Sequence, residues 1–478
     1  MTKREPTLLE ALVPLAVLIG LLASNVALFE DTLGGSNQVA LILAAAVAAV
    51  LALRTGVTWK KIEKRITGTI KSALPSILIL LLIGSLAGTW MISGVVPAMI
   101  YYGLGIISPR LFLVTAVIVG AIVSVVTGSS WSTVATVGIA LVGIGTSIGV
   151  PPPIVVGAII SGAYFGDKIS PLSDTTNLAA AMVDIDIFTH IKYLFYTTIP
   201  SLALTLIIFF IIGFGFDFSH TTADVENVRQ AISGAFHINP FLFLVPIFLL
   251  TIIILKVPPI PALLAGIMAG VVFALIFQPH IINQIADGKS NFLRAGYISS
   301  MQAMFGDVSI ATTNEAINDL LSTSGMKGML ETVWLILAAM TFGGTMEATG
   351  YLHRIILPLR RMSKGQGGLV ASTAATCLFF NATASDQYIS IVIPGRMFRK
   401  AYVERGLKPE VLSRTLEDSG TMTSVLIPWN TCGATQARVL GVATVEYLPY
   451  CFFNLISPLM SILFAVFNIK IRKLDRKD

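Results

Sequence analysis

Apolar runs of roughly 20 residues recur along this 478-residue chain, from Leu8 to Phe467. A helix of that length crosses the hydrocarbon core of a bilayer, which is about 30 Å thick. In hydrocarbon every backbone polar group has to be paired within the protein, so such runs fold as helices. Charged residues make up only 12% of the chain and the mean hydropathy is +0.82, whereas soluble domains carry roughly a quarter charged residues. The sequence therefore predicts an all-α polytopic membrane protein.

Ten apolar segments are predicted to span the membrane. They are residues 8–28, 37–53, 72–94, 158–190, 193–215, 239–256, 259–278, 331–350, 416–444 and 446–468. Two further apolar stretches, 111–146 and 368–395, begin and end on one side. The second has 28 residues and two crossings need about 40, so we expect a re-entrant hairpin there. The first, with 36 residues, fits either a hairpin or two short spans.

Basic residues near the ends of these segments predict the orientation, because Lys and Arg accumulate on the cytoplasmic side. With both termini inside, 25 of the 32 Lys and Arg residues fall in cytoplasmic segments and five in external ones. Only Lys168 and Arg438 remain within the membrane. We therefore expect a multi-pass protein of the cell (inner) membrane with both termini in the cytoplasm.

Three features recur at a nearly constant offset, which is the mark of an internal repeat. Gly94 and Gly350 are 256 residues apart, TGSSWST (127–133) and NATASDQ (381–387) are 254 apart, and Pro171 and Pro428 are 257 apart. Loop 142–157 has no basic residue, whereas its counterpart 396–414 has six. The two hairpins therefore open to opposite sides, as in the inverted repeats of secondary transporters.

The predicted organisation is two inverted five-helix repeats, each with a re-entrant hairpin and a broken helix. The first repeat covers residues 1–216 and contains hairpin 111–146, and an external linker covers 217–238. The second repeat covers 239–469 with hairpin 368–395 and an external connector, 279–330, and a basic cytoplasmic tail covers 470–478. In such folds the binding site lies at the midplane between the two repeats.

Hydroxyl, amide and carboxylate side chains gather at the hairpin tips and at the two Gly/Pro-interrupted helices. Non-helical backbone survives at this depth only where protein or a water-filled cavity surrounds it, and small hard cations prefer such oxygen ligands. The candidate cation- and proton-binding residues are Thr127, Ser129, Ser130, Thr133, Asp167, Ser173, Asp174, Thr175, Thr176, Asn381, Thr383, Ser385, Asp386, Asn430 and Thr431. Asp167 and Asp174 are the expected sodium ligands. Single Ser or Thr residues can equally serve close helix packing.

Several charged residues leave alternatives open. Asp167 or Asp174 could pair with Lys168, which would leave the other carboxylate free. Lys168, Glu347 and Arg438 are candidate proton or charge partners; Glu347 and Asp386 could instead be buried interhelical partners, for example of Arg438. Glu417 and Asp418 are expected near the cytoplasmic entrance, where water could solvate them.

The stretches TGSSWSTVATVG (127–138) and GAYFGDKISPLSDTTNLAA (162–180) resemble the signature of the NhaC family of sodium/proton antiporters, within the ion transporter superfamily. The resemblance runs over essentially the whole chain. It implies two inverted five-helix repeats with paired hairpins, a scaffold with a moving transport unit, and often a homodimer. By position, residues 127–133, 167–176, 381–386 and 430–431 would line the site. Members with nearly the same signature exchange malate for lactate or carry amino acids.

The resulting functional prediction is exchange of cytoplasmic sodium for external protons by alternating access, with sodium, protons and the lipid bilayer as partners. Sodium-coupled transport of an organic acid or amino acid is the alternative. No cofactor and no nucleic-acid partner are expected, and the three cysteines have no CxxC or metal-binding spacing. An enzyme is disfavoured because the sequence has no nucleophile–base or metal constellation, and the repeat with buried acids disfavours a channel.

Overall fold

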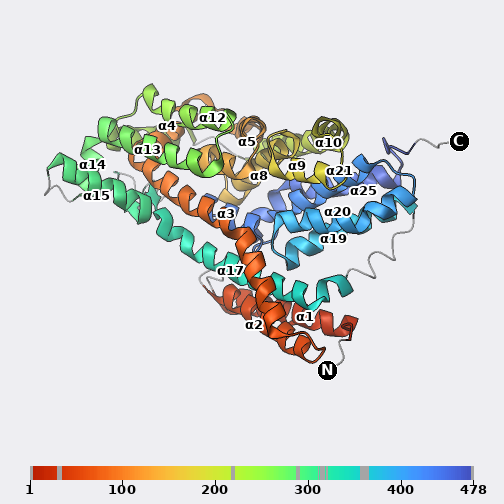
Figure 1. Ribbon diagram of the computed structural model, residues 1–478. Helices are drawn as coiled ribbons and strands as arrows, with labels where there is room; N and C mark the ends of the chain where they lie inside the picture. The colour runs from red at the N-terminus through yellow and green to blue at the C-terminus, as the bar shows by residue number, and fades with distance from the viewer. Residues whose placement is uncertain are drawn as a thin grey trace.

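The computed structural model describes residues 4–29, 35–216, 221–286, 291–310, 312, 318, 321–355 and 365–474. Nearly all of its elements are helices (Figure 1). In the N-terminal half they are α1 (Leu8–Leu28), α2 (Ser36–Leu53), α3 (Trp59–Ile92), α4 (Val95–Ile106), η1 (Pro109–Leu111), α5 (Phe112–Thr127), α6 (Ser130–Thr133), η2 (Val134–Gly138), α7 (Ile139–Ser147), α8 (Pro152–Ile169), α9 (Asp174–Ala181), α10 (Ile187–Phe214) and α11 (Thr221–Ala235).

The remaining elements, in the C-terminal half, are also nearly all helices. They are η3 (Pro240–Phe243), α12 (Leu244–Ile254), α13 (Pro259–Phe277), α14 (Pro279–Ile285), α15 (Phe292–Phe305), β1 (Val308–Ser309), β2 (Ser322–Thr323), α17 (Gly325–Thr349), α19 (Gly365–Thr383), α20 (Gln387–Glu404), α21 (Pro409–Leu416), η4 (Glu417–Thr421), α22 (Met422–Ser424), α23 (Thr431–Leu440), α24 (Thr444–Tyr447), η5 (Leu448–Tyr450) and α25 (Phe452–Val466). The two strands pair antiparallel.

Within the described residues, eight helices are long and apolar enough to cross a membrane, or ten if each of two bent helix pairs counts as one span. Large apolar side chains on their outer faces stay uncovered by protein: Leu9 is 75% exposed, Ile211 64% and Ile276 62%. In water such surface would be costly, but in lipid it is the favoured solvent contact. The chain is therefore a polytopic integral membrane protein, as the hydropathy predicts.

Several predicted boundaries agree with the helices and two are wrong. Segments 8–28 and 259–278 agree with α1 and α13 to within one residue. Residues 54–71, which separate the second and third predicted spans, enter α3 at Trp59, because their charges lie on exposed positions of a helix that continues into the apolar run. Likewise the second hairpin does not stop at 395: its returning arm, α20, runs on to Glu404 with exposed basic residues on its last turns.

The long helices α3 and α17 pack against each other along much of their length (Figure 1). In this view α3 runs from α2 at one end of the molecule to α4 and α13 at the other, and α1 and α2 lie beside the lower part of α17. Both helices end in a glycine with left-handed backbone, Gly94 (φ 79°) after α3 and Gly350 (φ 78°) after α17. Only glycine adopts that conformation without cost, which explains why each helix stops there.

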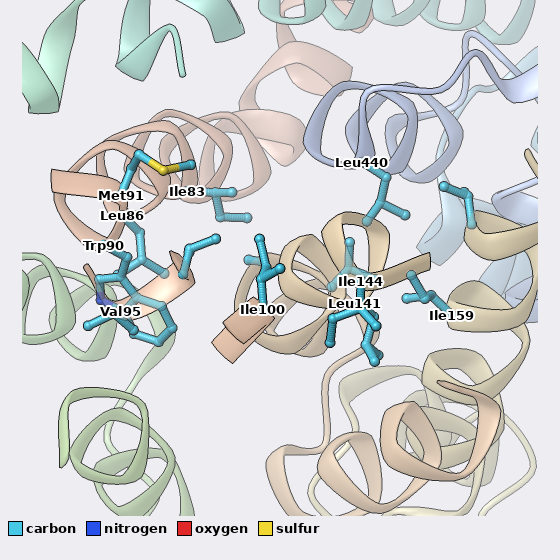
Figure 2. Close-up of a cluster of buried hydrophobic side chains, with 14 of the residues drawn as sticks. Ile83, Leu86, Trp90, Met91, Val95, Ile100, Leu141, Ile144, Ile159 and Leu440 are labelled. Atoms are coloured by element: carbon cyan, nitrogen blue, oxygen red, sulfur yellow. The ribbon is translucent and has the colours of Figure 1, made fainter. Parts of the chain in front are cut away.

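The largest hydrophobic cluster joins helices from both halves of the chain (Figure 2). Trp90, Met91 and Val95 occupy one end of it, near the α3–α4 turn, and its other end contains Ile144 and Ile159. Leu440, the last residue of α23, belongs to the second half and reaches down toward the helices that carry Ile144 and Ile159. This core holds α23 against the first hairpin and α8.

Helices α5 and α8 approach closely through small residues. A methyl group added to Gly162 would lie 2.2 Å from the carbonyl oxygen of Val117, and one on Gly166 would lie 2.5 Å from that of Ala121. Four-residue spacing of glycines lets two backbones meet in a membrane, where van der Waals packing rather than the hydrophobic effect drives helix association. This packing fixes the first hairpin against the helix that carries Asp167.

The same backbone turns recur in both halves at a constant separation. Left-handed residues pair at an offset of 257: Gly128 with Ser385, Gly149 with Gly406, and Asp184 with Gly441. Helix N-caps pair at the same offset: Ser129 with Asp386, Ser173 with Asn430, and Asp186 with Ala443. The sequence offset of 254 at the hairpin tips was therefore three residues short, because the left-handed position is Gly128 in one tip and a serine in the other.

The linker and the connector are partly helical. Residues 217–238 contain α11, whose Arg229 stacks on Tyr101 of α4 at 4.5 Å. The connector 279–330 contains α14, α15 and the short β1–β2 pair. Helix α15 packs against α3 and α17, and Ser85 of α3 donates a hydrogen bond to the carbonyl of Met304 at 2.8 Å.

Candidate functional site

The helix formed by α8 and α9 is broken over four residues. Helix α8 ends at Ile169, Pro171 lies in the gap, and Ser173 caps α9 by accepting a hydrogen bond from the backbone N–H of Thr176. The Thr176 hydroxyl donates to the carbonyl oxygens of Asp167 and Lys168, at 3.2 and 3.1 Å. The break is thus held in one geometry by its own side chains. It lies at Pro171, as predicted, whereas Gly166, which was also expected to interrupt the helix, lies inside α8 and packs against α5.

Asp167 lies at the junction between this break and the tip of the first hairpin. Its carboxylate accepts two hydrogen bonds from Ser130, one from the hydroxyl at 2.7 Å and one from the backbone N–H at 3.1 Å. It is 6% exposed and makes no ion pair in the described part of the chain. A buried carboxylate without a nearby cation is costly when ionised, so it favours a proton or a bound cation.

The first hairpin turns at Gly128, and its tip is tied together by hydroxyl groups. Thr127 and Thr133 contact each other through their hydroxyls at 3.3 Å, and Ser129 caps α6 through the backbone N–H of Ser132 at 3.2 Å. Directly after the tip the chain forms a π-helical turn, η2. Such turns add a residue to the helical repeat and occur frequently at functional sites.

A cavity of about 390 Å³ opens where these elements meet. Six of the candidate residues predicted from the sequence line it: Thr127, Ser129, Asp167, Asp174, Thr175 and Thr431. Asp174 is the first residue of α9 and is exposed to this space. Parts of both hairpins, both broken helices, α3 and the α12–α13 loop form the walls. The structure therefore brings the two halves together around one polar cavity.

Four of the five remaining candidates of the second half make structural hydrogen bonds, and the fifth, Ser385, does not. Asn381 donates to the carbonyl of Gly420 at 2.7 Å, and Asn430 donates to the carbonyl of Asn381 at 3.1 Å. Asp386 caps α20 by accepting from the backbone N–H of Ile389 at 2.8 Å. Thr383 bonds back within its helix to Phe379, and the Ser385 hydroxyl is buried with no partner in the described chain.

Lys168 pairs with neither Asp167 nor Asp174. Its ammonium group forms a fully buried ion pair with Asp418 and donates to the Ser457 hydroxyl at 2.7 Å. Asp418 also accepts hydrogen bonds from Thr197 and Ser461 at 2.9 and 2.6 Å. A buried ion pair survives when both charges are hydrogen-bonded in this way. Lys168 thus links the first broken helix to η4 and α25.

The sequence suggested that Glu417 and Asp418 lie near a solvated cytoplasmic entrance, but this expectation is wrong. Both are completely buried, because a second π-helical turn, η4, places them inside the helix bundle. The Thr175 hydroxyl donates to Glu417 at 3.2 Å, so Glu417 lies one hydrogen bond away from a side chain that lines the cavity. The position of these acids, three and four residues past the basic segment 396–414, did not indicate that they would be buried so deeply.

Glu347 and Arg438 lie away from the cavity. Glu347 pairs with Arg65 of α3. It is therefore an interhelical partner, as one of the alternatives held, but its partner is Arg65 and not Arg438. Arg438 approaches Glu331 of α17 at 3.5 Å. Both Arg438 and Glu331 line a second cavity of about 300 Å³, which also contains Asn37, Pro428 and Trp429.

Some residues that line the cavity were not predicted from the sequence. Trp131, Tyr388 and Cys432 line the cavity close to predicted residues. The predicted residues near them, at the two hairpin tips and at the second broken helix, were the available signal. Lys256 and Ser76 also line it, from the α12–α13 loop and from α3. Nothing in the sequence placed these two near Asp167, because their proximity depends on how distant helices pack.

Residues 162–469 match the model of the Na⁺/H⁺ antiporter family. The chain belongs to this family. The relatives include the Na⁺/H⁺ antiporter NhaC of Alkalihalophilus pseudofirmus, 36% identical over 96% of both chains, and that of Bacillus subtilis, 37% identical over 89% of this chain and 91% of the relative. A third is the malate-2H⁺/Na⁺-lactate antiporter of B. subtilis, 34% identical over 97% of this chain and 95% of the relative. The family resemblance predicted from the two motifs is confirmed, and this antiporter is a secondary transporter rather than an enzyme.

Proposed function

We propose that this protein exchanges cytoplasmic sodium for external protons, with Asp167 as the carboxylate that the two ions share. The observation that carries this proposal is the position of Asp167: buried, without an ion pair among the described residues, and at the wall of a polar cavity. Such a group takes either a proton or a sodium ion, but not both at once. Competition for one carboxylate couples the two ions without a separate proton path.

Sodium would be held by oxygen atoms around this carboxylate. Asp174, Thr127, Ser129 and Thr175 line the same cavity and supply carboxylate and hydroxyl oxygens, the ligand type that small hard cations prefer. Asp174 is exposed to the cavity, so it fits a first contact for entering sodium. Asp386 and Asn430 cap helices, and we leave them out of the proposed coordination shell.

We also propose that the halves are inverted repeats and that transport proceeds by alternating access. The two cavities support this proposal because they use equivalent positions. Pro171 and Leu172 line the first, and Pro428 and Trp429, 257 residues later, line the second. On the orientation predicted by the basic residues, Lys256 marks a cytoplasmic opening of the first cavity and Asn37 an external opening of the second. Each cavity would then serve one face of the membrane.

The inversion has a direct topological test. Single cysteines at Ser147 and Lys408, in a background without Cys377, Cys432 and Cys451, should react with an impermeant thiol reagent from opposite faces of the cell membrane. The two positions flank the equivalent left-handed glycines Gly149 and Gly406. Labelling of both from the same face would contradict inverted repeats.

The transport function is tested in proteoliposomes loaded with a pH-sensitive dye. A sodium pulse should drive proton movement in the opposite direction, and Asp167→Asn should abolish it while the protein remains inserted and folded. Malate, lactate and amino acids are added in separate arms. If sodium moves protons only when one of these anions is present, simple sodium/proton exchange is the wrong function.

Sodium-coupled exchange of organic acids is the second candidate. Lys168 and Arg438, the two basic residues predicted within the membrane, could pair with such an anion, but they are engaged by Asp418 and Glu331. Lys256 instead lines the cavity with Asp167 and could hold a carboxylate. If this candidate is right, Lys256→Gln should remove the stimulation by malate or lactate and spare sodium/proton exchange.

A further inference from the structure

Lys256 lies on the wall of the cavity that contains Asp167 and Asp174, and the proposed sodium/proton exchange does not use it. It comes from the α12–α13 loop, whereas the two acids come from the first broken helix. Among the described residues that line this cavity, these three carry the only charges. The cavity of about 390 Å³ holds on the order of a dozen water molecules at roughly 30 Å³ each, so the charges on its walls act on one small volume.

The backbone places this lysine at a position where glycine is the usual residue. Helix α12 closes with two hydrogen bonds, from the backbone N–H of Val257 to the carbonyl of Ile252 at 3.1 Å and from that of Lys256 to the carbonyl of Ile253 at 2.9 Å. In this type of helix ending, the residue after the cap has left-handed backbone and is usually glycine. Lys256 has a φ of 62°, which is unfavourable for a residue with a Cβ. The lysine is therefore present at a conformational cost.

Lys470 shows a contact that can compensate for such a backbone. It also has a left-handed φ, of 50°, and its ammonium group lies 5.6 Å from the centre of the Tyr196 ring. Lys256 is exposed and makes no ion pair, side-chain hydrogen bond or ring contact with any described residue. Its charge thus has no structural partner in the described chain, and the cavity is the feature of the molecule on which it acts.

The proposed sodium ligands do not by themselves reject divalent cations. Carboxylate and hydroxyl oxygens are also the ligands that Ca²⁺ and Mg²⁺ prefer. Two carboxylates attract a divalent ion about twice as strongly as a monovalent one, because the Coulomb energy is proportional to the charge of the ion. A transporter that takes sodium from the cytoplasm meets Mg²⁺ at the same opening. Selection against divalent ions therefore needs a further group in the cavity.

A positive charge on the cavity wall supplies this selection. The ammonium group repels a divalent ion about twice as strongly as sodium. Asp167, Asp174, Lys256 and one sodium ion together have no net charge, whereas a divalent ion in the same place leaves one positive charge in excess. Uncompensated charge is costly where little water is present. Without the lysine the balance reverses, because a divalent ion would neutralise the two carboxylates and sodium would not.

We propose that Lys256 sets the selectivity of this cavity for monovalent over divalent cations. This inference rests on the proposed sodium/proton exchange and names the residue that keeps Ca²⁺ and Mg²⁺ away from its ion site. The ammonium group acts through its field rather than as a ligand of sodium. The unfavourable backbone of Lys256 is then the cost of holding a positive charge at this place.

Inhibition of sodium/proton exchange by calcium measures this selectivity. Proteoliposomes receive sodium at the Km of each variant and increasing CaCl₂, at constant ionic strength so that screening stays equal. In Lys256→Gln, half-inhibition should occur at a calcium concentration about tenfold lower than in the wild type. The Km for sodium should fall by roughly threefold, because the repulsion that is removed is half as large for a monovalent ion. Lys256→Arg keeps the charge and should keep the wild-type values.

Two further variants separate the charge from the backbone. Lys256→Gly removes the charge and suits the left-handed φ, so it should be as sensitive to calcium as Lys256→Gln while its melting temperature is no lower than that of the wild type. Lys470→Gln is the matched control, a lysine with the same backbone that does not line the cavity, and it should keep the wild-type sensitivity.

The inference is wrong if Lys256→Gln and Lys256→Gly keep the wild-type sensitivity to calcium. It is also wrong if Lys256→Arg becomes as sensitive as Lys256→Gln, because the effect would then come from the side-chain shape and not from the charge. Absence of any sodium/proton exchange in the wild type would instead overturn the proposed function.

A binding measurement keeps the inference testable if Lys256→Gln does not transport. Calorimetric titration of the detergent-solubilised protein with CaCl₂ should show affinity about tenfold higher in Lys256→Gln than in the wild type. The additional change Asp174→Asn should remove this binding, which places the calcium ion in the cavity. Equal calcium affinity of the wild type and Lys256→Gln would contradict a selectivity role of Lys256.

Discussion

The two halves of the molecule repeat the same backbone turns but fill them with different chemistry. In the first half Asp167 joins the broken helix to the hairpin tip, whereas the position 257 residues later is Ser424, which bonds back to the carbonyl of Thr421 at 2.7 Å. In the second half the hairpin tip carries Asp386 where the first has Ser129, and both residues cap a helix. Equivalent geometry therefore carries a buried acid at the cavity wall in one half and structural hydrogen bonds in the other.

A second contrast lies in how each hairpin is fixed to its broken helix. Ser124 donates to the carbonyl of Ala163, and at the equivalent place Asn381 donates to that of Gly420. The first half adds close glycine packing, while the second forms the π-helical turn that buries Glu417 and Asp418. The comparison teaches that the two halves share a framework of backbone turns, and that the buried charges are distributed unequally over it.

The largest effect is expected when the first half is given the chemistry of the second. Asp167→Ser copies Ser424 and should reduce sodium-driven proton flux at least about 100-fold, because the variant can no longer exchange a proton for sodium at this position. Loss of a buried charge–ligand interaction of about 3 kcal/mol corresponds to that factor. Flux in proteoliposomes measures it. Asp386→Asn is the matched control in the second half, because Asn caps helices as well as Asp and flux should persist. Loss of flux in Asp386→Asn alone would reverse the assignment.

Close packing of the first half should be the next most sensitive feature. Gly162→Ala places a methyl group against the backbone of Val117 and should lower stability by about 1–3 kcal/mol, the usual range for overpacking. Thermal unfolding in detergent measures the loss. Gly20→Ala on α1 is the control, because nothing lies within 4 Å of the added methyl. Equal stability of the two variants would mean that α5 and α8 separate without cost.

A smaller effect is expected in the pH dependence of the transport kinetics. If the acid of the first half holds both ions in turn, the apparent Km for sodium should rise as pH falls, because protons occupy the same carboxylate, and the maximal rate should change much less. Rates measured over a sodium series at several pH values test this, and high sodium should restore activity at low pH. A maximal rate that falls while Km stays constant would favour separate sites for proton and sodium.

The smallest effect is expected for acids outside the cavity. Glu347→Gln removes the pair with Arg65, a partly exposed interaction between α3 and α17. Such pairs contribute roughly 0–1 kcal/mol, so stability should fall slightly and the Km for sodium should stay at the wild-type value. A large rise in Km would show that this end of the molecule takes part in sodium binding.

Hydropathy predicted much of this fold because membrane helices satisfy their backbone internally and leave a clear apolar signature. Pro171 marked the break between α8 and α9, because proline cannot continue a helix, whereas Gly166 lies inside α8 and did not mark it. The full length of α3 was missed because its first turns are basic and amphipathic rather than apolar. The left-handed backbone of Ser385 was not predicted, because the hairpin imposes this conformation and only a glycine would have indicated such a turn in the sequence.

The candidate site was predicted in its first half and only partly in its second. Thr127, Ser129, Asp167 and Asp174 line the cavity as expected from their clustering in the sequence. The partner of Lys168 and the burial of Glu417 could not be predicted, because both depend on η4 packing against α9 and α25. Side chains about 250 residues apart meet through tertiary structure alone.

The buried contact of Lys168 also sets an order for biogenesis. Its ion-pair partner Asp418 lies on η4 and its hydrogen-bond partner Ser457 is 289 residues further along the chain. At a synthesis rate of roughly 5–20 residues per second, the second partner emerges about 15–60 s after Lys168 has entered the translocon, and Asp418 somewhat earlier. Until Asp418 arrives, the ammonium group has to be sheltered by water, lipid headgroups or insertion factors. A ribosome that stalls before η4 therefore leaves behind a truncated chain with an unmatched charge for quality-control proteases to recognise, and the first broken helix acquires its final position only when α25 arrives.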